Sequence, residues 1–155
     1  MGIEKRLHDL GIVLPSPAAP VANYVPFVRA GSLLVISGQL PFGPDGKFAP
    51  GHVGKVGATV FNEGGQEAAR VCAINILAQA KAALGSLEKI RQCVRLAGYV
   101  NCTPGFTALA PIMNGASDLM VQALGERGKH ARLTVGMAEL PLDAAIEVEA
   151  MFEVE

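Results

Sequence analysis

The strongest constraint on the fold is an alternation of apolar and other residues near the end of the chain. Every second residue is apolar over 131–137, and the same period returns over 146–154. A Pro/Asp turn at 140–143 separates the two segments. Period two with one apolar side is typical of strands that bury one face. We therefore expect an antiparallel terminal hairpin with Leu140 opposite Asp143.

The alternation also predicts which side chains of this hairpin point away from the core. They are Arg132, Thr134, Gly136, Glu147, Glu149 and Met151. A guanidinium held inside a strand can bind a carboxylate through two parallel hydrogen bonds, and a carboxylate such as Glu147 can orient a water or accept a proton. Hairpin pairing separates Arg132 from Glu147 by about 13 Å at strand rise, so we expect both to line one cleft without touching. Plain solvent exposure stays open as the alternative for both side chains.

The rest of the chain predicts a scaffold for that pocket. Strands are expected at 23–28, 33–38 and 92–101, and helices at 66–84 and from about 111 to 124. The strand at 33–38 is apolar throughout, which favours burial on both sides. This order predicts an α+β domain, a mixed sheet with two helices on one face.

Three further local features are expected. A short helix built on Ile3, Leu7 and Leu10 ends at Gly11, and a Pro-rich tether then runs to residue 20. Residues 41–63 form a long loop with a short strand near 55–60. Asn62 caps the next helix, whose apolar stripe is expected to hold Val71, Ile74, Leu77, Ala78 and Ala82. We divide the chain into an N-terminal extension, 1–20, and a single domain, 21–155.

Composition limits the function classes. The net charge is −1 and no basic stripe occurs, which argues against nucleic-acid binding. No apolar run approaches the ~20 residues of a membrane helix, and we expect a cytoplasmic protein. Only 17% of the residues are charged, so we expect apolar surface to be hidden in an oligomer.

The cysteines and histidines predict no metal site. Cys72, Cys93 and Cys102 show no metal-type spacing and are expected to be buried apolar groups rather than redox groups. His8 and His52 have no partner at metal spacing, and His130 is expected at the surface. The chain also lacks a phosphate-binding loop pattern and a Gly-x-Ser-x-Gly elbow.

Two motifs together resemble the RidA/YjgF family of reactive-intermediate deaminases. One runs from Ala131-Arg132-Leu133-Thr134-Val135 through Leu140-Pro141 to Ile146-Glu147-Val148-Glu149-Ala150. The other is Leu34-Val35-Ile36-Ser37-Gly38-Gln39-Leu40-Pro41. The resemblance spans about residues 22–154. It implies a chorismate-mutase-like fold, a homotrimer with sites in the clefts between subunits, and no cofactor or metal.

The resemblance also implies roles for single residues. Arg132 matches the arginine that binds the substrate carboxylate, Glu147 the carboxylate that holds the hydrolytic water, and Gly38 the glycine beside the ligand. Tyr24 and Asn114 match a tyrosine and an asparagine of the pocket.

Several positions depart from the family pattern. Thr134 stands where many members carry cysteine and is expected to lend a small polar contact to the substrate. Residues 1–20, the loop after Gln39 and the region from Pro104 to Pro111 also differ, which leaves the choice of substrate open.

The resemblance thus predicts a hydrolase that converts small 2-imino or enamine acids to 2-oxo acids and ammonia. Two alternatives stay open. One is a non-catalytic small-carboxylate-binding protein or sensor that uses the same inter-subunit cleft. The other, less favoured by the acidic balance of the chain, is an endoribonuclease.

Overall fold

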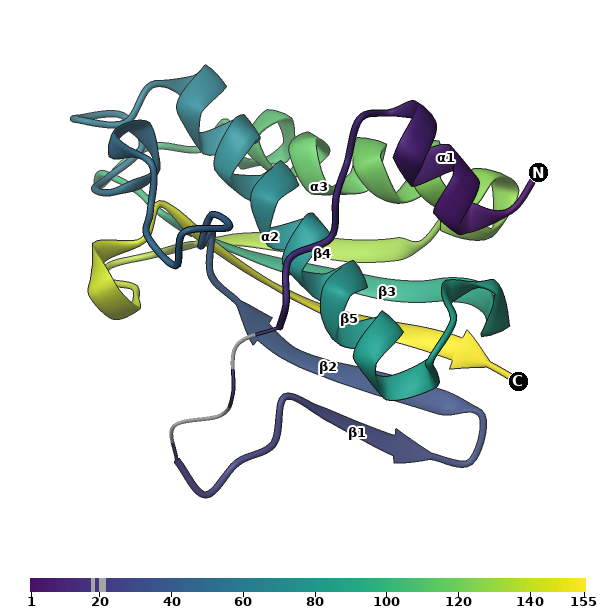
Figure 1. Ribbon diagram of the computed structural model, residues 1–155. Coiled ribbons are helices and arrows are strands. Elements are labelled where there is room, and N and C mark those ends of the chain that lie inside the picture. The colour runs from purple at the N-terminus through teal and green to yellow at the C-terminus, as the bar shows by residue number, and fades with distance from the viewer. Residues whose placement is uncertain (18, 20–21) are drawn as a thin grey trace.

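The computed structural model describes residues 1–17, 19 and 22–155. Within these residues the chain forms an α+β unit of three α-helices and one five-stranded sheet (Figure 1). The elements are α1 (Ile3–Asp9), β1 (Phe27–Ala30), β2 (Leu33–Gln39), α2 (Asn62–Leu84), β3 (Ile90–Asn101), α3 (Leu109–Leu124), β4 (Ala131–Met137) and β5 (Ile146–Val154). Short 3-10 turns lie at Pro50–His52, Leu87–Lys89, Gly125–Gly128 and Pro141–Asp143. The predicted order of strands and helices is confirmed.

The sheet is mixed, as predicted, but the terminal hairpin is wrong. The strand order is β1-β2-β5-β3-β4, so β3 lies between the two strands that were expected to pair. β3 pairs in parallel with β4 and antiparallel with β5. The α3 crossover joins the parallel pair. The connection at 138–145 crosses the end of β3, where the Asn101 amide donates to the Ala145 carbonyl. A period of two predicts a strand but not its partner.

The predicted faces of β4 are reversed. Arg132 lies opposite Leu96, which is fully buried on the side of the helices. Arg132, Thr134 and Gly136 therefore point to the helix side of the sheet, and the apolar residues Leu133 and Val135 point to the other side. The prediction assumed that the apolar side of a strand faces the core of its own chain. For β5 the prediction is confirmed, because Ile146, Val148, Ala150, Phe152 and Val154 are buried.

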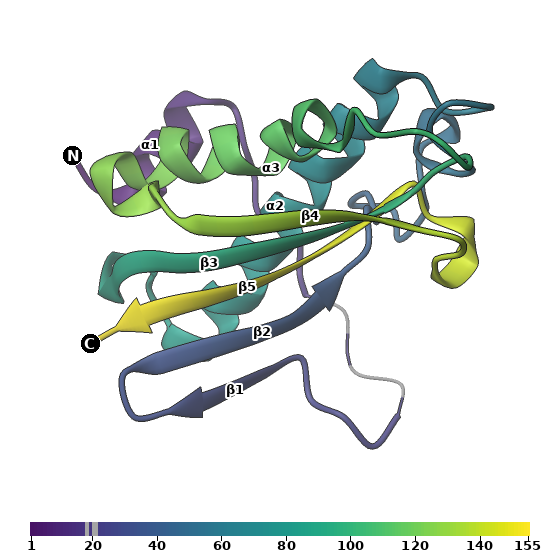
Figure 2. The same cartoon turned by 180° about the vertical axis from the view of Figure 1, so that it is seen from behind.

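All three helices lie on one side of the sheet, and the opposite face is bare (Figures 1 and 2). This explains why β2 is not buried on both sides as expected. Leu34 and Ile36 are fully buried under α2, whereas Leu33 and Val35 are 37% and 38% exposed on the bare face. The bare face is thus partly apolar.

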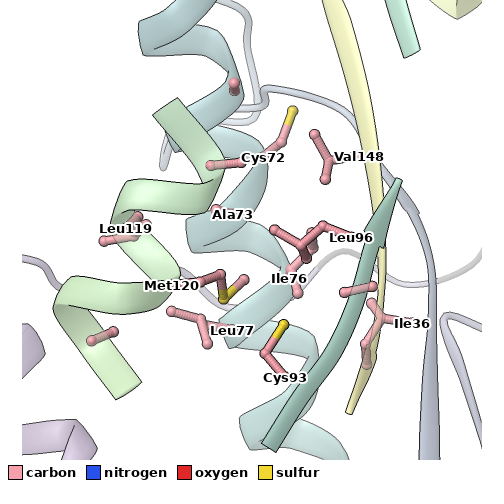
Figure 3. Packing of buried hydrophobic residues seen from close by; sticks show 14 of the residues in the cluster. Ile36, Cys72, Ala73, Ile76, Leu77, Cys93, Leu96, Leu119, Met120 and Val148 are labelled. Carbon is pink, nitrogen blue, oxygen red and sulfur yellow. The ribbon is translucent and has the colours of Figure 1, made fainter. Parts of the chain in front are cut away.

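The core between helices and sheet is built from small and aliphatic side chains (Figure 3). On α2 the predicted stripe is confirmed in part: Leu77 and Ala78 are buried and the half-buried Ile74 packs against the core, whereas Val71 is only half-buried and Ala82 is exposed. The buried side also carries small residues, including Ala68, Ala69, Cys72, Ala73 and Ala80, together with Ile76. Small side chains let the helix approach the sheet closely, and a pattern weighted by hydrophobic size misses them.

The second long helix agrees better with the sequence. α3 begins at Leu109 with Pro111 in its first turn. All four core positions that were predicted for it, Ile112, Ala116, Leu119 and Leu124, are buried.

The N-terminal helix is confirmed and packs on the rest of the chain. Ile3 and Leu7 are buried and belong to the core cluster, while Leu10 is exposed. The Glu4 carboxylate accepts hydrogen bonds from the Lys81 ammonium at 3.2 Å and the Leu87 amide at 3.3 Å. The end of the predicted tether and the predicted boundary between residues 20 and 21 lie outside the described residues.

Three boundaries differ from the prediction. β1 begins at Phe27 rather than Asn23. The residue before it, Pro26, accepts a hydrogen bond from the Ser37 amide but lies outside the paired part of the strand. The loop before α2 holds only isolated bridges, among them Val56 with Val60, in place of the short strand. Asn62 is the first residue of α2 and Phe61 occupies its N-cap, without a side-chain hydrogen bond.

Candidate functional site

Arg132 is held against α3 by two hydrogen bonds from one guanidinium nitrogen. Its Nη1 donates to Asn114 Oδ1 at 2.8 Å and to Ser117 Oγ at 3.0 Å. Asn114 and Ser117 are three residues apart, so they lie on the same face of the helix. The structure therefore brings together Arg132 and Asn114, two of the residues singled out in the sequence.

The contact continues through Ser117 to His130. Ser117 Oγ lies 2.9 Å from His130 Nε2, and His130 Nδ1 lies 2.6 Å from the Gly128 carbonyl oxygen. Since a carbonyl oxygen can only accept, Nδ1 carries a proton and donates to it. In neutral His130 the nitrogen Nε2 then accepts from the Ser117 hydroxyl. His130 is half-buried here, so the prediction that it is a plain surface residue is wrong.

Sequence reasoning missed Ser117 and His130, although two signals were available. Ser117 stands three residues after Asn114 on the same helix. His130 stands two residues before Arg132. Because side chains two residues apart in an extended chain point to the same side, His130, Arg132 and Thr134 share one side. We call Asn114, Ser117, His130, Arg132 and Thr134 the arginine group.

The contacts of Arg132 leave one edge of its guanidinium open. Both hydrogens of Nη1 are engaged, and Nη2 makes one long bond, 3.4 Å, to the Ala110 carbonyl oxygen. Within the described part of the chain, Nε has no acceptor. Nε and the second hydrogen of Nη2 point in parallel, which is the geometry that binds both oxygens of a carboxylate. The exposed side chain thus keeps a pair of donors for a ligand.

Thr134 lies in the same row of β4 as Arg132. Its hydroxyl oxygen is enclosed and has no hydrogen-bond partner among the described residues. An unpaired buried hydroxyl costs about 1–3 kcal/mol, so such a group is uncommon in a folded chain. Because this oxygen is enclosed, a ligand could reach it only if neighbouring atoms moved. The predicted contact between Thr134 and the substrate stays a prediction.

Glu147 belongs to a second cluster, on the bare face. A methyl group added at Gly38 would lie 2.2 Å from Glu147 Oε1, so the carboxylate packs directly against the glycine. Burial raises the pKa of the half-buried Glu147 carboxyl, and the negative charge of Glu149 raises that pKa further. Tyr99 in turn donates to Glu149 Oε1 at 3.1 Å. Glu147 is thus a partly desolvated carboxylate, the kind suited to proton transfer.

Tyr24 lies on the segment that bonds to Ser37, the residue before Gly38. Its neighbour Val25 accepts a hydrogen bond from Ser37 Oγ at 2.8 Å, and Pro26 accepts one from the Ser37 amide at 2.9 Å. Ser37 directly precedes Gly38, so the segment that carries Tyr24 is fastened beside the glycine. We call Tyr24, Gly38 and Glu147 the glutamate group.

The two groups do not meet within one chain. Arg132 lies opposite Leu96 and Glu147 opposite Tyr99, an odd number of residues along β3, so their side chains point to opposite faces of the sheet. The predicted common face of Arg132 and Glu147 is therefore wrong for a single chain. β4 forms one edge of the sheet, and Tyr24 precedes β1, which forms the other edge (Figure 2).

One cavity of the structure lies away from the predicted site residues. A cavity of about 470 Å³ is lined by Lys55, Cys102, Phe106, Gly136 and Glu139 among others, but by none of the predicted site residues. No group of three His, Cys, Asp or Glu side chains within the described residues could hold a metal ion.

The cysteines are mostly buried, as expected. Cys72 and Cys93 are fully buried, whereas Cys102 is half-buried. Burial raises the pKa of the Cys93 thiol to about 12 and that of Cys72 well above the ordinary range. In residues 1–17, 19 and 22–155 no helix is both long and apolar enough to pass through a membrane.

Comparison with known sequences identifies the family. A profile described as "YjgF/chorismate mutase-like, putative endoribonuclease" matches residues 4–154. The chain belongs to this family. It is also 44% identical over 152 residues to Protein TCP17 of Trypanosoma cruzi. The matched residues cover 97% of this chain and 93% of that protein.

Several solved structures have the same fold. The protein Atu1372 of unknown function from Agrobacterium tumefaciens is 49% identical, with a TM-score of 0.91 and coverage of 99% of this chain and 92% of that one. RidA from Psychrobacter sp. PAMC 21119 is 25% identical, with a TM-score of 0.61 over 90% and 94% of the two chains. TdcF of E. coli, solved with bound serine, is 23% identical, with a TM-score of 0.64 over 90% and 94%, and supports the fold alone.

Proposed function

We propose that this chain hydrolyses small reactive 2-imino or enamine acids to 2-oxo acids and ammonia. The observation that carries the proposal is the open edge of the Arg132 guanidinium. Asn114 and Ser117 fix one nitrogen, and two parallel donors are left for a substrate carboxylate. The similarity to a protein named RidA, in the same family, supports the same reaction class.

The reaction then needs a water placed at the imine carbon. Arg132 would bind the carboxylate and so orient that carbon. Glu147 would accept a proton from the water as its oxygen bonds to the carbon, while the C=N electron pair moves to nitrogen, which takes that proton from the Glu147 carboxyl. The Glu147 carboxylate would then accept the proton of the new hydroxyl group and pass it to nitrogen. The C–N bond breaks, its electron pair leaves with ammonia, and the C=O bond forms. The raised pKa of the Glu147 carboxyl favours this exchange of protons near neutral pH.

We further propose that each site forms between two chains of a homotrimer. Arg132 lies on the edge strand β4, whereas Glu147 lies on the central strand β5 with its side chain on the opposite face of the sheet. A ring of chains would place the β4 edge of one subunit beside Gly38 and Glu147 of the next.

The bare face gives this assembly a driving force. Val28, Leu33, Val35, Leu133, Val135 and Met137 are exposed on the single chain. Burial of such surface favours association by roughly 25 cal/mol per Å² of apolar area. Light scattering coupled to size exclusion should give a mass of about three times 16.1 kDa. A stable, active monomer would contradict the shared site.

The activity is tested by following release of ammonia from iminopropanoate that is generated in the assay. The purified protein should accelerate its loss over buffer, and Arg132→Ala should abolish the acceleration. Arg132→Lys should also lose most activity, because an ammonium cannot reproduce the two parallel donors. Full activity of the lysine variant would contradict the role of the guanidinium.

Two further measurements separate the deaminase from the alternative functions. Calorimetric binding of pyruvate without turnover of any imino acid would favour a carboxylate-binding protein or sensor. Cleavage of a labelled RNA that survives the Arg132 and Glu147 substitutions would favour an endoribonuclease. The net charge of −1 supports the first two readings over the third.

A further inference from the structure

The contacts of Ser117 and His130 suggest a task beyond packing. Together with Arg132 they form one directed series of hydrogen bonds, from Arg132 Nη1 to Ser117 Oγ, from the Ser117 hydroxyl to His130 Nε2, and from His130 Nδ1 to the Gly128 carbonyl. Each hydrogen in the series has a single acceptor, and the fixed end of the series is a backbone oxygen.

We infer that Ser117 and His130 are positioning residues, which hold the guanidinium of Arg132 with its Nε edge turned toward the substrate carboxylate. The inference rests on the proposed function, since it assigns a task to residues of the same site. Neither side chain needs to touch the substrate.

The series supports this task because it leaves the serine oxygen little freedom. Its hydrogen is directed at the histidine nitrogen, so a lone pair of Oγ is turned toward Arg132 at 3.0 Å. Without His130 the hydroxyl could rotate and turn its hydrogen toward the guanidinium, which would repel it. Asn114 alone would then hold Nη1, and with only the long bond from Nη2 to the Ala110 carbonyl besides, the plane of the guanidinium is held less firmly.

Ser117 and His130 also have the spacing of a nucleophile and its base. The donor bond from Arg132 withdraws electron density from Oγ, which disfavours attack by that oxygen. We therefore assign the pair to positioning, and a covalent role becomes one outcome of the test.

The test is a binding measurement on the intact oligomer with pyruvate as the probe and pyruvamide as its uncharged counterpart. Ser117→Ala and His130→Phe should each weaken pyruvate binding by about fivefold to tenfold, the effect of one lost hydrogen bond. Binding of pyruvamide should not change, because it lacks the carboxylate. Ser117→Thr should restore binding, since it keeps the hydroxyl.

A double-mutant cycle shows whether the two residues act through Arg132. In an Arg132→Ala background, Ser117→Ala and His130→Phe should have no further effect on pyruvate binding. Equal losses with and without Arg132 would overturn the inference and indicate a merely structural role. His130→Gln, whose amide oxygen can replace Nε2 as the acceptor, serves if the phenylalanine variant does not fold.

Matched controls and the remaining outcomes complete the design. His8→Phe and Ser32→Ala change the same residue types at exposed positions and should leave binding unchanged. If the wild-type oligomer binds no pyruvate, Arg132 does not bind a carboxylate and the inference is overturned. If pyruvate binding depends on Ser117 but no imino acid is turned over, the deaminase proposal fails and the positioning role stands. A covalent adduct at Ser117 with an activated ester would overturn the positioning role.

Discussion

Replacing Gly38 with alanine should displace the Glu147 carboxylate by about 1 Å and leave the fold intact. The added methyl carbon would lie 2.2 Å from Glu147 Oε1 and 3.0 Å from Glu147 Cδ. Ordinary contact begins near 3.4 Å, so the carboxylate has to retreat by about 1 Å. The obstacle is the end of a flexible side chain, and Gly38 does not need a left-handed backbone.

A displacement of this size has a large expected effect on rate and a small one on stability. Misplacement of a catalytic group by about 1 Å can cost about 10²-fold in rate. Alanine in place of glycine changes the free energy of unfolding by only about 0.4–1 kcal/mol through the unfolded chain. We therefore expect kcat on iminopropanoate to fall about a hundredfold, with a nearly unchanged melting temperature.

The assay combines the ammonia-linked rate with calorimetric binding of pyruvate. Loss of kcat with unchanged binding indicates a displaced Glu147, whereas weaker binding would show that the methyl group blocks the ligand itself. Gly51→Ala is the matched control, because a methyl group there meets no atom within 4 Å and should change neither quantity. Wild-type activity of the Gly38 variant would refute the idea that the position of Glu147 controls the rate.

Three other predictions follow from burial and charge. Because the Glu147 carboxyl has a raised pKa in the folded chain, its protonated form favours folding, and this contribution is lost as the pH rises through that pKa. Melting temperatures from acid to neutral pH should therefore show Glu147→Gln gaining stability relative to wild type as the pH increases; a constant difference would contradict the shift. In a thiol-reagent titration at pH 8, Cys102 should react before Cys72 and Cys93, whose pKa values burial raises, and rapid reaction of all three in the folded protein would refute their burial. Val135→Glu places a charge on the bare apolar face and should shift the mass in light scattering from trimer to monomer, whereas an unchanged trimer would remove this face from the interface.

The sequence predicted the elements of the fold better than their arrangement. α3 could be placed by its apolar period, because its large side chains all face the core. α2 is apolar on most sides, so the buried row of small residues around Cys72 and Ala73 did not stand out. β4 was recognised as a strand, but its apolar side faces away from the helices of its own chain. A pattern in one chain cannot tell a strand face that packs on the core from an apolar face that stays exposed on the single chain.

The candidate site was predicted by its residue types and not by its geometry. The strand position of Arg132 and its motif were visible, and Asn114 lies within hydrogen-bond distance of it. The split of the site into two groups was not visible, since it depends on β3 lying between β4 and β5. Ser117 and His130 were missed because their link to Arg132 crosses from a helix to a strand.

The central claim is that one site draws Arg132 from one chain and Glu147 from another, and mixed oligomers test it most directly. Arg132→Ala and Glu147→Gln chains, each inactive alone, would be co-expressed with different tags and the mixed oligomer purified through both. As a control, Arg132→Ala chains mixed with Arg132→Lys chains carry both lesions in the same group and should gain nothing. Each mixed trimer should regain about a third of the wild-type sites, because only one of its three junctions joins an intact arginine group to an intact glutamate group. Mixed oligomers that form and stay inactive would contradict a site shared between chains.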